Sequence, residues 1–148
     1  YEYFYNSLRR ENNLFKGLNL VNFLGNHDVK RIASNLDNPA HYTHAMVALL
    51  LMKGIPCLYY GDEFGMEGTP DDGTDEHSGG DDAMRRPMPD CSAPNTWPQI
   101  GVSRLALNKK LIKIRNDHPV FAQAGSQDMV RIFLYFPNPG TLFARTRR

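Results

Sequence analysis

The chain has 148 residues, which fits one ordinary domain, and its formal net charge at pH 7 is +1. Hydrophobic residues make up 41% and charged residues 22% of the chain, so the composition allows a buried core and excludes an intrinsically disordered protein. The near-neutral charge gives no reason to expect a nucleic-acid partner, and the longest apolar run, Ala45 to Met52, is too short to cross a membrane.

Two apolar runs in the first half predict β-strands with a helix between them. Residues 18–24, "LNLVNFL", are nearly all apolar, which is typical of a strand that is buried on both faces of a parallel sheet. Residues 41–53, "HYTHAMVALLLMK", predict a helix that ends at Gly54, because glycine is favoured directly after a helix. Residues 55–60, "IPCLYY", predict a second strand, in which Cys57 is expected to be a small buried thiol.

The second half begins with a long irregular segment. Residues 65–101 show no hydrophobic period and are rich in Gly, Pro and Asp, and loops of this length are usually functional or disordered. Leu107, Leu111 and Ile114 then recur at helical spacing and predict an amphipathic helix, which Pro119 ends. The runs "MVRIFLYF" and "TLFART" that follow predict two strands joined by the turn "PNPG".

Alternating strands and helices predict a parallel α/β architecture. In such folds the chemistry gathers at the C-terminal ends of the strands. Asn26-His27-Asp28 follows the first predicted strand and Asp62-Glu63 follows the second. Both polar clusters are therefore placed where functional residues are expected.

Two other interpretations of the first cluster stay open from the residues alone. Asn26 or Asp28 can cap the helix that follows, because both residue types are common at that position. Alternatively, His27 and Asp28 with His41 and His44 suggest a metal-dependent phosphohydrolase. Metal chemistry of that kind needs several converging ligands, whereas His41 and His44 are expected on the exposed face of their helix.

Three motifs in a fixed order carry a resemblance to a known family. "FLGNHDVKR", "GIPCLYYGDEFGMEG" and "RRPMP" resemble the last third of the catalytic barrel of the α-amylase family (glycoside hydrolase family 13), in the style of its neopullulanase and cyclomaltodextrinase branch. The resemblance covers about residues 18–121. It implies that residues 1–121 are the C-terminal part of a (β/α)8 TIM barrel, with strands seven and eight at residues 20–24 and 55–60. Residues 122–148 would then begin a C-terminal β-sandwich domain.

The resemblance also implies roles for five residues. Asp28 matches the family's third catalytic carboxylate, which stabilises the transition state, and His27 matches a histidine that hydrogen-bonds the same sugar, with Asn26 beside them as a substrate-binding residue. Asp81 and Arg85 match an Asp and an Arg, four residues apart, that hold sugar further from the cleaved bond. The family's frequent "DPD" before the arginines reads "DDAM" here, so the second acid of that motif is missing.

The implied function is that of a retaining glycoside hydrolase acting on α-glucosidic bonds of starch-like glucans or maltooligosaccharides. A carboxylate that accepts two sugar hydroxyls makes charge-assisted bonds, which strengthen as the ring approaches an oxocarbenium ion. The family's nucleophile motif "GxRxD" and its acid, a Glu at a strand end, do not occur in this sequence. Asp62 and Glu63 are not expected to replace them, because the family's Glu at that point is structural. We therefore expect a chain that lacks the N-terminal part of its barrel and is inactive alone.

No cofactor is expected to be required and no metal is expected at the site, whereas a structural calcium is possible in the complete enzyme. The acidic loop lacks the Asp-x-Asp-x-Asp-Gly spacing of a calcium loop; its acids are Asp71, Asp72, Asp75, Glu76, Asp81 and Asp82. The alternative function is a non-catalytic amylase-like barrel, as in the heavy chains of amino-acid transporters. The presence of both His27 and Asp28 argues against that alternative.

Overall fold

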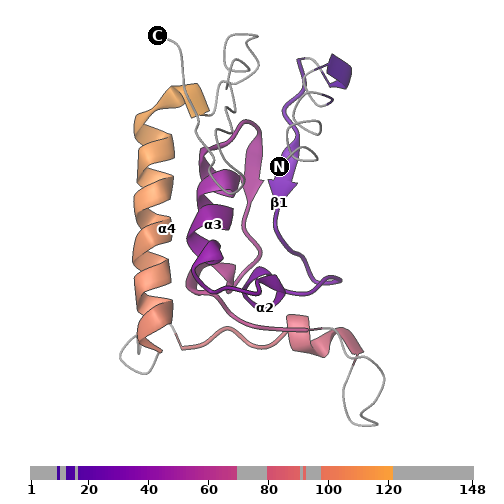
Figure 1. The fold of residues 1–148 in the computed structure, drawn as a ribbon, viewed down its shortest axis with the longest axis vertical. Coiled ribbons are helices and arrows are strands. Elements are labelled where there is room, and N and C mark those ends of the chain that lie inside the picture. Colours follow the sequence, from indigo (N-terminus) through magenta and orange to yellow (C-terminus); the bar gives the residue numbers. More distant parts are fainter. Residues whose placement is uncertain are drawn as a thin grey trace.

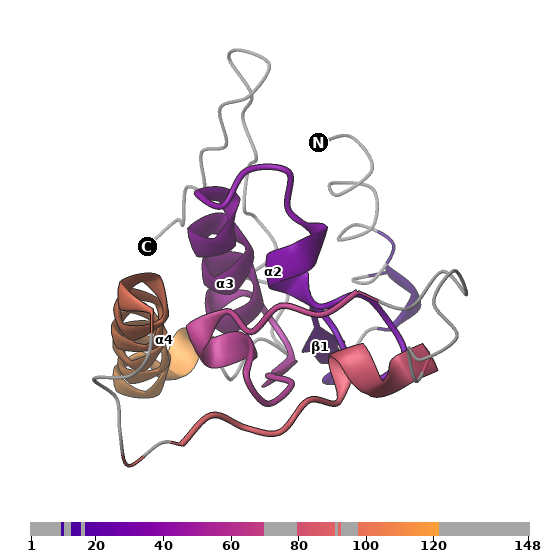
Figure 2. The ribbon, with the colours of Figure 1, turned by 90° about the horizontal axis from the view of Figure 1, so that it is seen from below.

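A computed structural model of the chain describes residues 10, 13–15, 17–69, 80–90, 92 and 98–121. The elements in chain order are β1 (Val21–Phe23), α2 (Ile32–Asn35), α3 (His41–Leu51), β2 (Ile55–Cys57), the short 3-10 helices η1 (Asp62–Phe64) and η2 (Gly80–Met84), α4 (Gln99–Asp117) and the 3-10 turn η4 (Pro119–Phe121). Figures 1 and 2 show three layers, with α3 between α4 and the two strands. The two strands predicted after Phe121, and most of the residues before Gly17, lie outside the described residues.

The two strands pair in parallel, as the order of the predicted elements indicated. Val21 lies opposite Ile55, and Phe23 lies opposite Cys57. The connection between them runs through α2 and α3, and α3 packs against β2. A parallel pair needs a crossover of this kind, because its second strand must start at the same end as its first. The C-terminal ends of β1 and β2 therefore lie side by side, and the predicted polar clusters follow them.

The strands are shorter and more exposed than the apolar runs predicted. The predicted strand at residues 18–24 is reduced to the three residues of β1, and the predicted strand at residues 55–60 to the three residues of β2. Val21 is 56% exposed, Phe23 is 55% exposed and Ile55 is 50% exposed. The expectation that the first strand is buried on both faces is therefore wrong for the described part of the chain.

The sheet has two faces of different character, which explains this difference. Val21, Phe23, Ile55 and Cys57 are all exposed and, by their register, share one face, which we call the open sheet face. Asn22 points to the other face, where its amide donates to the carbonyl of Lys53 (2.6 Å). Within the described residues, only the face toward α3 is covered. Cys57 is an exposed free thiol rather than the buried one that was predicted.

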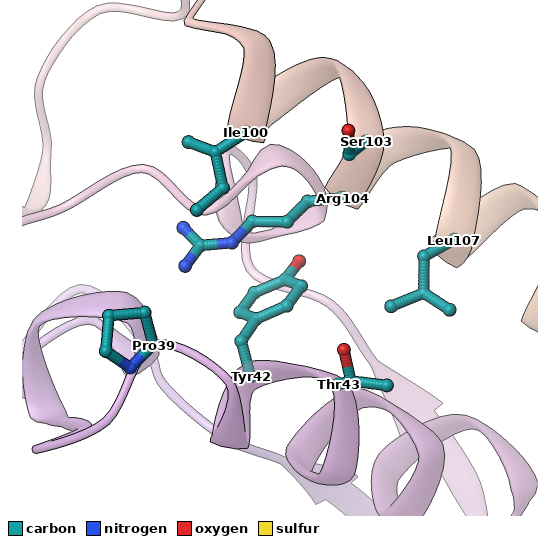
Figure 3. Close-up of a pocket in the computed structure, with 7 residues that line it drawn as sticks. All are labelled: Pro39, Tyr42, Thr43, Ile100, Ser103, Arg104 and Leu107. Atoms are coloured by element: carbon teal, nitrogen blue, oxygen red, sulfur yellow. The ribbon is translucent and has the colours of Figure 1, made fainter.

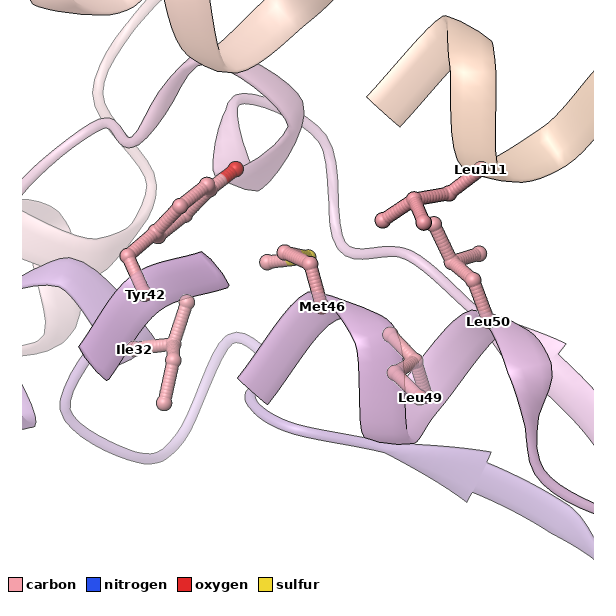
Figure 4. Close-up of a cluster of buried hydrophobic side chains, with 6 residues drawn as sticks. All are labelled: Ile32, Tyr42, Met46, Leu49, Leu50 and Leu111. Atoms are coloured by element: carbon pink, nitrogen blue, oxygen red, sulfur yellow. The ribbon is translucent and has the colours of Figure 1, made fainter. Parts of the chain in front are cut away.

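The core lies between α3 and its neighbours (Figure 4). Its buried side chains come from α2, α3 and α4, and they are Ile32, Tyr42, Met46, Leu49, Leu50 and Leu111. The four that α3 contributes have spacings of four, three and one residues, which place them on one side of a helix. His41 and His44 lie on its exposed side, as predicted.

The end of α3 is fixed by Gly54 and by Arg115 of α4. Gly54 has a φ of +102°, and a Cβ there would lie 2.5 Å from the Asn22 amide nitrogen and 2.6 Å from the Leu20 carbonyl oxygen. The Arg115 guanidinium donates to the carbonyls of Leu50 and Met52, both at 2.9 Å, and to that of Gly54 at 2.5 Å. It thereby satisfies acceptors that the end of a helix leaves unpaired.

The predicted second helix is confirmed, and α4 begins at Gln99, before the residues whose spacing revealed it. It ends at Asp117, two residues before Pro119, as the proline predicted. Its Asn108 is 1% exposed and donates to the Tyr42 hydroxyl (2.7 Å) and to the Glu63 carbonyl (2.6 Å). None of the helices in the described ranges combines the length and the apolar character that crossing a membrane requires.

Candidate active site

The turn after β1 carries the first predicted cluster. The side-chain oxygen of Asn26 accepts hydrogen bonds from the backbone N–H groups of Asp28 (2.8 Å) and Val29 (3.1 Å). This is the local closure of a turn that Asn commonly makes. Helix α2 begins later, at Ile32, and no side chain caps it. The capping interpretation is therefore wrong for α2, because neither Asn26 nor Asp28 caps it, and Asn26 closes the turn instead.

The carboxylate of Asp28 lies beside two other predicted site residues. Its Oδ1 atom is 3.3 Å from Nε2 of His27 and 3.3 Å from Nη2 of Arg85. All three side chains face solvent, with 59% of His27, 59% of Asp28 and 44% of Arg85 exposed. Arg85 follows η2 and is 57 residues from Asp28 in the chain. The fold thus gathers a carboxylate, an imidazole and a guanidinium from two distant segments.

This arrangement is suited to holding a neutral polyhydroxylated ligand. Among the described residues, both contacts of Asp28 are made through Oδ1, which leaves Oδ2 open to accept hydroxyl groups. Ionised acceptors form stronger hydrogen bonds than neutral ones. Asp81 is in η2, four residues before Arg85, but its side chain lies outside the described part of the structure.

The second polar cluster, Asp62-Glu63, has a structural environment. Asp62 is 2% exposed and pairs with the guanidinium of Arg31 at 3.1 Å. Burial raises the pKa of the Asp62 carboxyl to about 6, against the opposing attraction of Arg31. The Asp62 carbonyl accepts a hydrogen bond from the Tyr42 hydroxyl (2.5 Å). These contacts tie η1 to α3, so this cluster serves packing rather than an open site.

A cavity of about 350 Å³ lies between α3 and α4 and is shown in Figure 3. Burial raises the pKa of the Tyr42 phenol in its wall to about 12, and the Arg104 guanidinium lies 4.4 Å from the centre of that ring. Asn26, His27, Asp28 and Arg85 do not line the cavity; among the described residues its walls are Pro39, Tyr42, Thr43, Ile100, Ser103, Arg104 and Leu107. The cavity is thus separate from the cluster around Asp28.

No group of three or more potential metal ligands occurs in the described ranges. His41 and His44 contact each other on the exposed side of α3, with ring centres 6.0 Å apart. Four acids of the acidic loop that was considered for a structural calcium lie outside those ranges: Asp71, Asp72, Asp75 and Glu76.

Sequence reasoning missed Arg31, whose side chain is fully buried three residues after Asp28. A basic residue in a polar stretch is normally solvated, so nothing in the pattern "NHDVKR" indicated burial. Its spacing of only three residues from Asp28 was a signal in the sequence. That spacing indicates a structural role only when the fold shows that the segments around Tyr60 and Met84 lie beside it.

A parallel β-α-β unit with a carboxylate, an imidazole and a guanidinium beyond the C-terminal ends of its strands is typical of the active-site end of a barrel enzyme. Residues 2–124 match the family described as "Alpha amylase, catalytic domain". The chain belongs to the α-amylase family of glycoside hydrolases, glycoside hydrolase family 13, as its motifs indicated. The catalytic domain of this family is a TIM barrel, and the described residues are a small mixed α/β part.

Similar proteins carry names from several branches of this family. The chain is 30% identical to the maltogenic alpha-amylase of Bacillus acidopullulyticus over 74% of its own length and 16% of that protein. It is 30% identical to the cyclomaltodextrin glucanotransferase of Bacillus sp. (strain 17-1) over 73% of its length and 13% of that protein. It is also 30% identical to neopullulanase 2 of Thermoactinomyces vulgaris, over 66% and 14%. The chain thus spans 16% or less of the length of these three relatives.

Proposed function

We propose that this chain is the C-terminal part of the catalytic barrel of a retaining α-glucan-acting glycosidase, and that it supplies one side of the active site. β1 corresponds to barrel strand seven and β2 to strand eight, with residues 1–121 in the barrel and residues 122–148 at the start of a β-sandwich domain. We refer to the longer protein as the full-length enzyme. Its substrates are starch-like glucans or maltooligosaccharides, whose α-1,4 or α-1,6 links it cleaves or transfers.

The cluster around Asp28 is the observation that carries this proposal. Arg85 and Asp28 are 57 residues apart in the chain, and both belong to motifs that resemble this family. Their side chains nevertheless meet at 3.3 Å, beside His27 and beyond the end of β1. A helix cap or a solvated loop does not require three such side chains from two segments to converge.

Each residue of the cluster has a distinct role in the proposal. Asp28 stabilises the positive charge that develops on the sugar ring, and its free oxygen accepts sugar hydroxyls. His27 donates to the same sugar and orients it. The oxygen of Asn26 is used by the turn, so its amide nitrogen is the group that donates to substrate. Arg85, with Asp81, holds sugar further from the cleaved bond.

The open sheet face supports the assignment to a barrel. Its apolar residues, Val21, Phe23 and Ile55, are unusual for a surface that water covers permanently. In a closed barrel one face of every strand points into the packed interior, where branched apolar side chains dominate. The remaining strands would bury this face in the full-length enzyme.

The activity of the isolated chain tests the proposal. Retaining hydrolysis needs two carboxyl groups on opposite sides of the bond, and the family motifs that carry them are absent from this sequence. The full-length enzyme should hydrolyse starch, pullulan or cyclodextrin, whereas the purified 148-residue chain should show no activity on any of them. Activity of the isolated chain, after removal of contaminating amylase, would show that it is not a part of a larger site. A full-length protein with no activity on these substrates would contradict the substrate class.

A further inference from the structure

Arg31 is a charged side chain with no exposed surface, three residues after Asp28. Its Nε and Nη2 atoms both donate to the carbonyl oxygen of Met84, at 3.0 and 2.6 Å. Its Nη1 atom donates to the carbonyl of Tyr60 at 2.6 Å and to Oδ1 of Asp62 at 3.1 Å. One guanidinium therefore joins the turn after β1, the segment after β2, and η2.

The surroundings of Arg31 compensate for the burial of its charge. An isolated buried charge is very unfavourable, and pairing with hydrogen bonds reduces that cost. Asp62 supplies the opposite charge, and the rings of Tyr59 and Tyr60 lie 4.5 and 4.8 Å from the guanidinium carbon. Such ring contacts are favourable for arginine. The residue after Met84 is Arg85, which contacts Asp28.

Backbone contacts near Arg31 also hold a neighbouring segment, at Gly68, against η2. The N–H of Arg31 donates to the carbonyl of Gly68 (2.9 Å), and the N–H of Gly68 donates to the Ser34 hydroxyl (2.9 Å). A Cβ at position 68 would collide with the carbonyl oxygen of Ala83 in η2. The chain thus approaches η2 as closely as only glycine permits.

We propose that Arg31 is a positioning residue for the cluster around Asp28. By holding the carbonyl of Met84, Arg31 places the next residue, Arg85, at ion-pair distance from the carboxylate of Asp28. This structural role follows from the contacts alone, and its effect on catalysis rests on the proposed function.

The variant Arg31→Lys tests whether the hydrogen bonds of the guanidinium are needed, or only its positive charge. Lysine keeps the positive charge beside Asp62, but it lacks the planar fork that reaches two acceptors on different sides. It should therefore lose the paired bonds to Met84 and release η2. The matched control is Arg115→Lys, because Arg115 is also a buried arginine that binds carbonyl groups, and its partners Leu50, Met52 and Gly54 are not part of η2.

The first measurement is amide hydrogen exchange in the full-length enzyme. The N–H of Arg85 donates to the carbonyl of Asp82 at 3.0 Å, so its exchange reports the order of η2. In Arg31→Lys we expect this exchange to accelerate at least about tenfold, a change of about 1.4 kcal/mol, with no acceleration in Arg115→Lys. Unchanged exchange in Arg31→Lys, or equal acceleration in both variants, would overturn the inference.

The second measurement is a double-mutant cycle on kcat/KM. If Arg31 acts through Arg85, Arg31→Lys should lower kcat/KM about 10- to 100-fold alone and cause little further loss in an Arg85→Ala background. Fully additive losses would refute an action through Arg85. Should Asp28→Asn leave activity intact, the proposed function fails, and the exchange measurement still decides the positioning role.

If Arg31→Lys does not fold, Gly68→Ala supplies the same test. It keeps the Arg31 guanidinium and Asp62 in the sequence, but its Cβ would collide with the Ala83 carbonyl oxygen and would lie 3.2 Å from Cδ of Arg31, so it should loosen the contact of Arg31 with η2 and accelerate exchange at Arg85 as well. Exchange at the wild-type rate in Gly68→Ala would show that η2 is held by other contacts and would contradict the proposal.

Discussion

Asn26 and Asp28 occupy the same short turn and use their side-chain oxygens differently. The oxygen of Asn26 is occupied by two backbone N–H groups, whereas the carboxylate of Asp28 faces His27, Arg85 and solvent. One residue therefore shapes the turn and the other remains available for chemistry. A substitution of Asn26 should therefore report on the stability of the turn, and a substitution of Asp28 should report on the chemistry.

Asn26→Ala should destabilise the turn and should leave the contacts in the rest of the fold unchanged. Removing an oxygen that accepts backbone hydrogen bonds in this way typically costs about 1 kcal/mol, and Asn26→Asp, which keeps the acceptor, should be nearly neutral. Melting temperatures of the full-length enzyme and these two variants check the prediction. If alanine and aspartate lower the melting temperature equally, the oxygen is not what stabilises the turn.

At the residue scale, the sequence predicted the members of the cluster but not its support. His27, Asp28 and Arg85 were predicted from motifs that resemble those of the family, and the fold brings their side chains together, while their roles at the site stay predictions. Arg31 could not, because its partners Tyr60, Asp62 and Met84 are 29 to 53 residues away. Hydrophobic periodicity reports burial of apolar side chains and is silent about a buried guanidinium.

At the scale of elements, types were predicted well and lengths were not. The two strands and the helix between them follow from apolar runs, and the end of α4 follows from Pro119, whereas α3 ends at Leu51, two residues before the predicted Lys53. The strands were predicted too long because an apolar run marks residues suited to burial, whereas a strand exists only where a neighbour supplies hydrogen bonds. In the described residues each strand has one such neighbour.

Gly54→Ala should be more destabilising than the same change at Gly17. Both glycines have positive φ, of +102° and +84°, so alanine is strained at both. At Gly17 nothing lies within 4 Å of the added carbon, whereas at Gly54 it meets Asn22 and Leu20. We expect about 1 kcal/mol of destabilisation at Gly17 and clearly more at Gly54. Equal shifts of the thermal unfolding midpoint would show that the junction of α3 and β2 adapts without strain.

At the scale of the whole molecule, the open sheet face dominates the behaviour expected of the isolated chain. Its apolar side chains favour association, as do the outer edges of β1 and β2, which pair with no further strand among the described residues. Alone, the chain should be oligomeric or poorly soluble in sedimentation experiments. Phe23→Glu should increase the monomer fraction, whereas Val120→Glu, at an exposed position in η4, should not. A wild-type monomer with a sharp cooperative melt would indicate a self-sufficient small fold.

The central claim, that Asp28 acts on the transition state, is tested most directly by kcat of Asp28→Asn in the full-length enzyme. Asparagine keeps the shape and removes the charge, so the melting temperature should change little while kcat falls on the order of 10²–10³-fold, about 2.7–4 kcal/mol, and KM changes much less. The control is Asp37→Asn, an exposed acid outside the cluster, which should leave kcat unchanged. A kcat for Asp28→Asn near that of the wild type would remove Asp28 from the active site and contradict the proposed function.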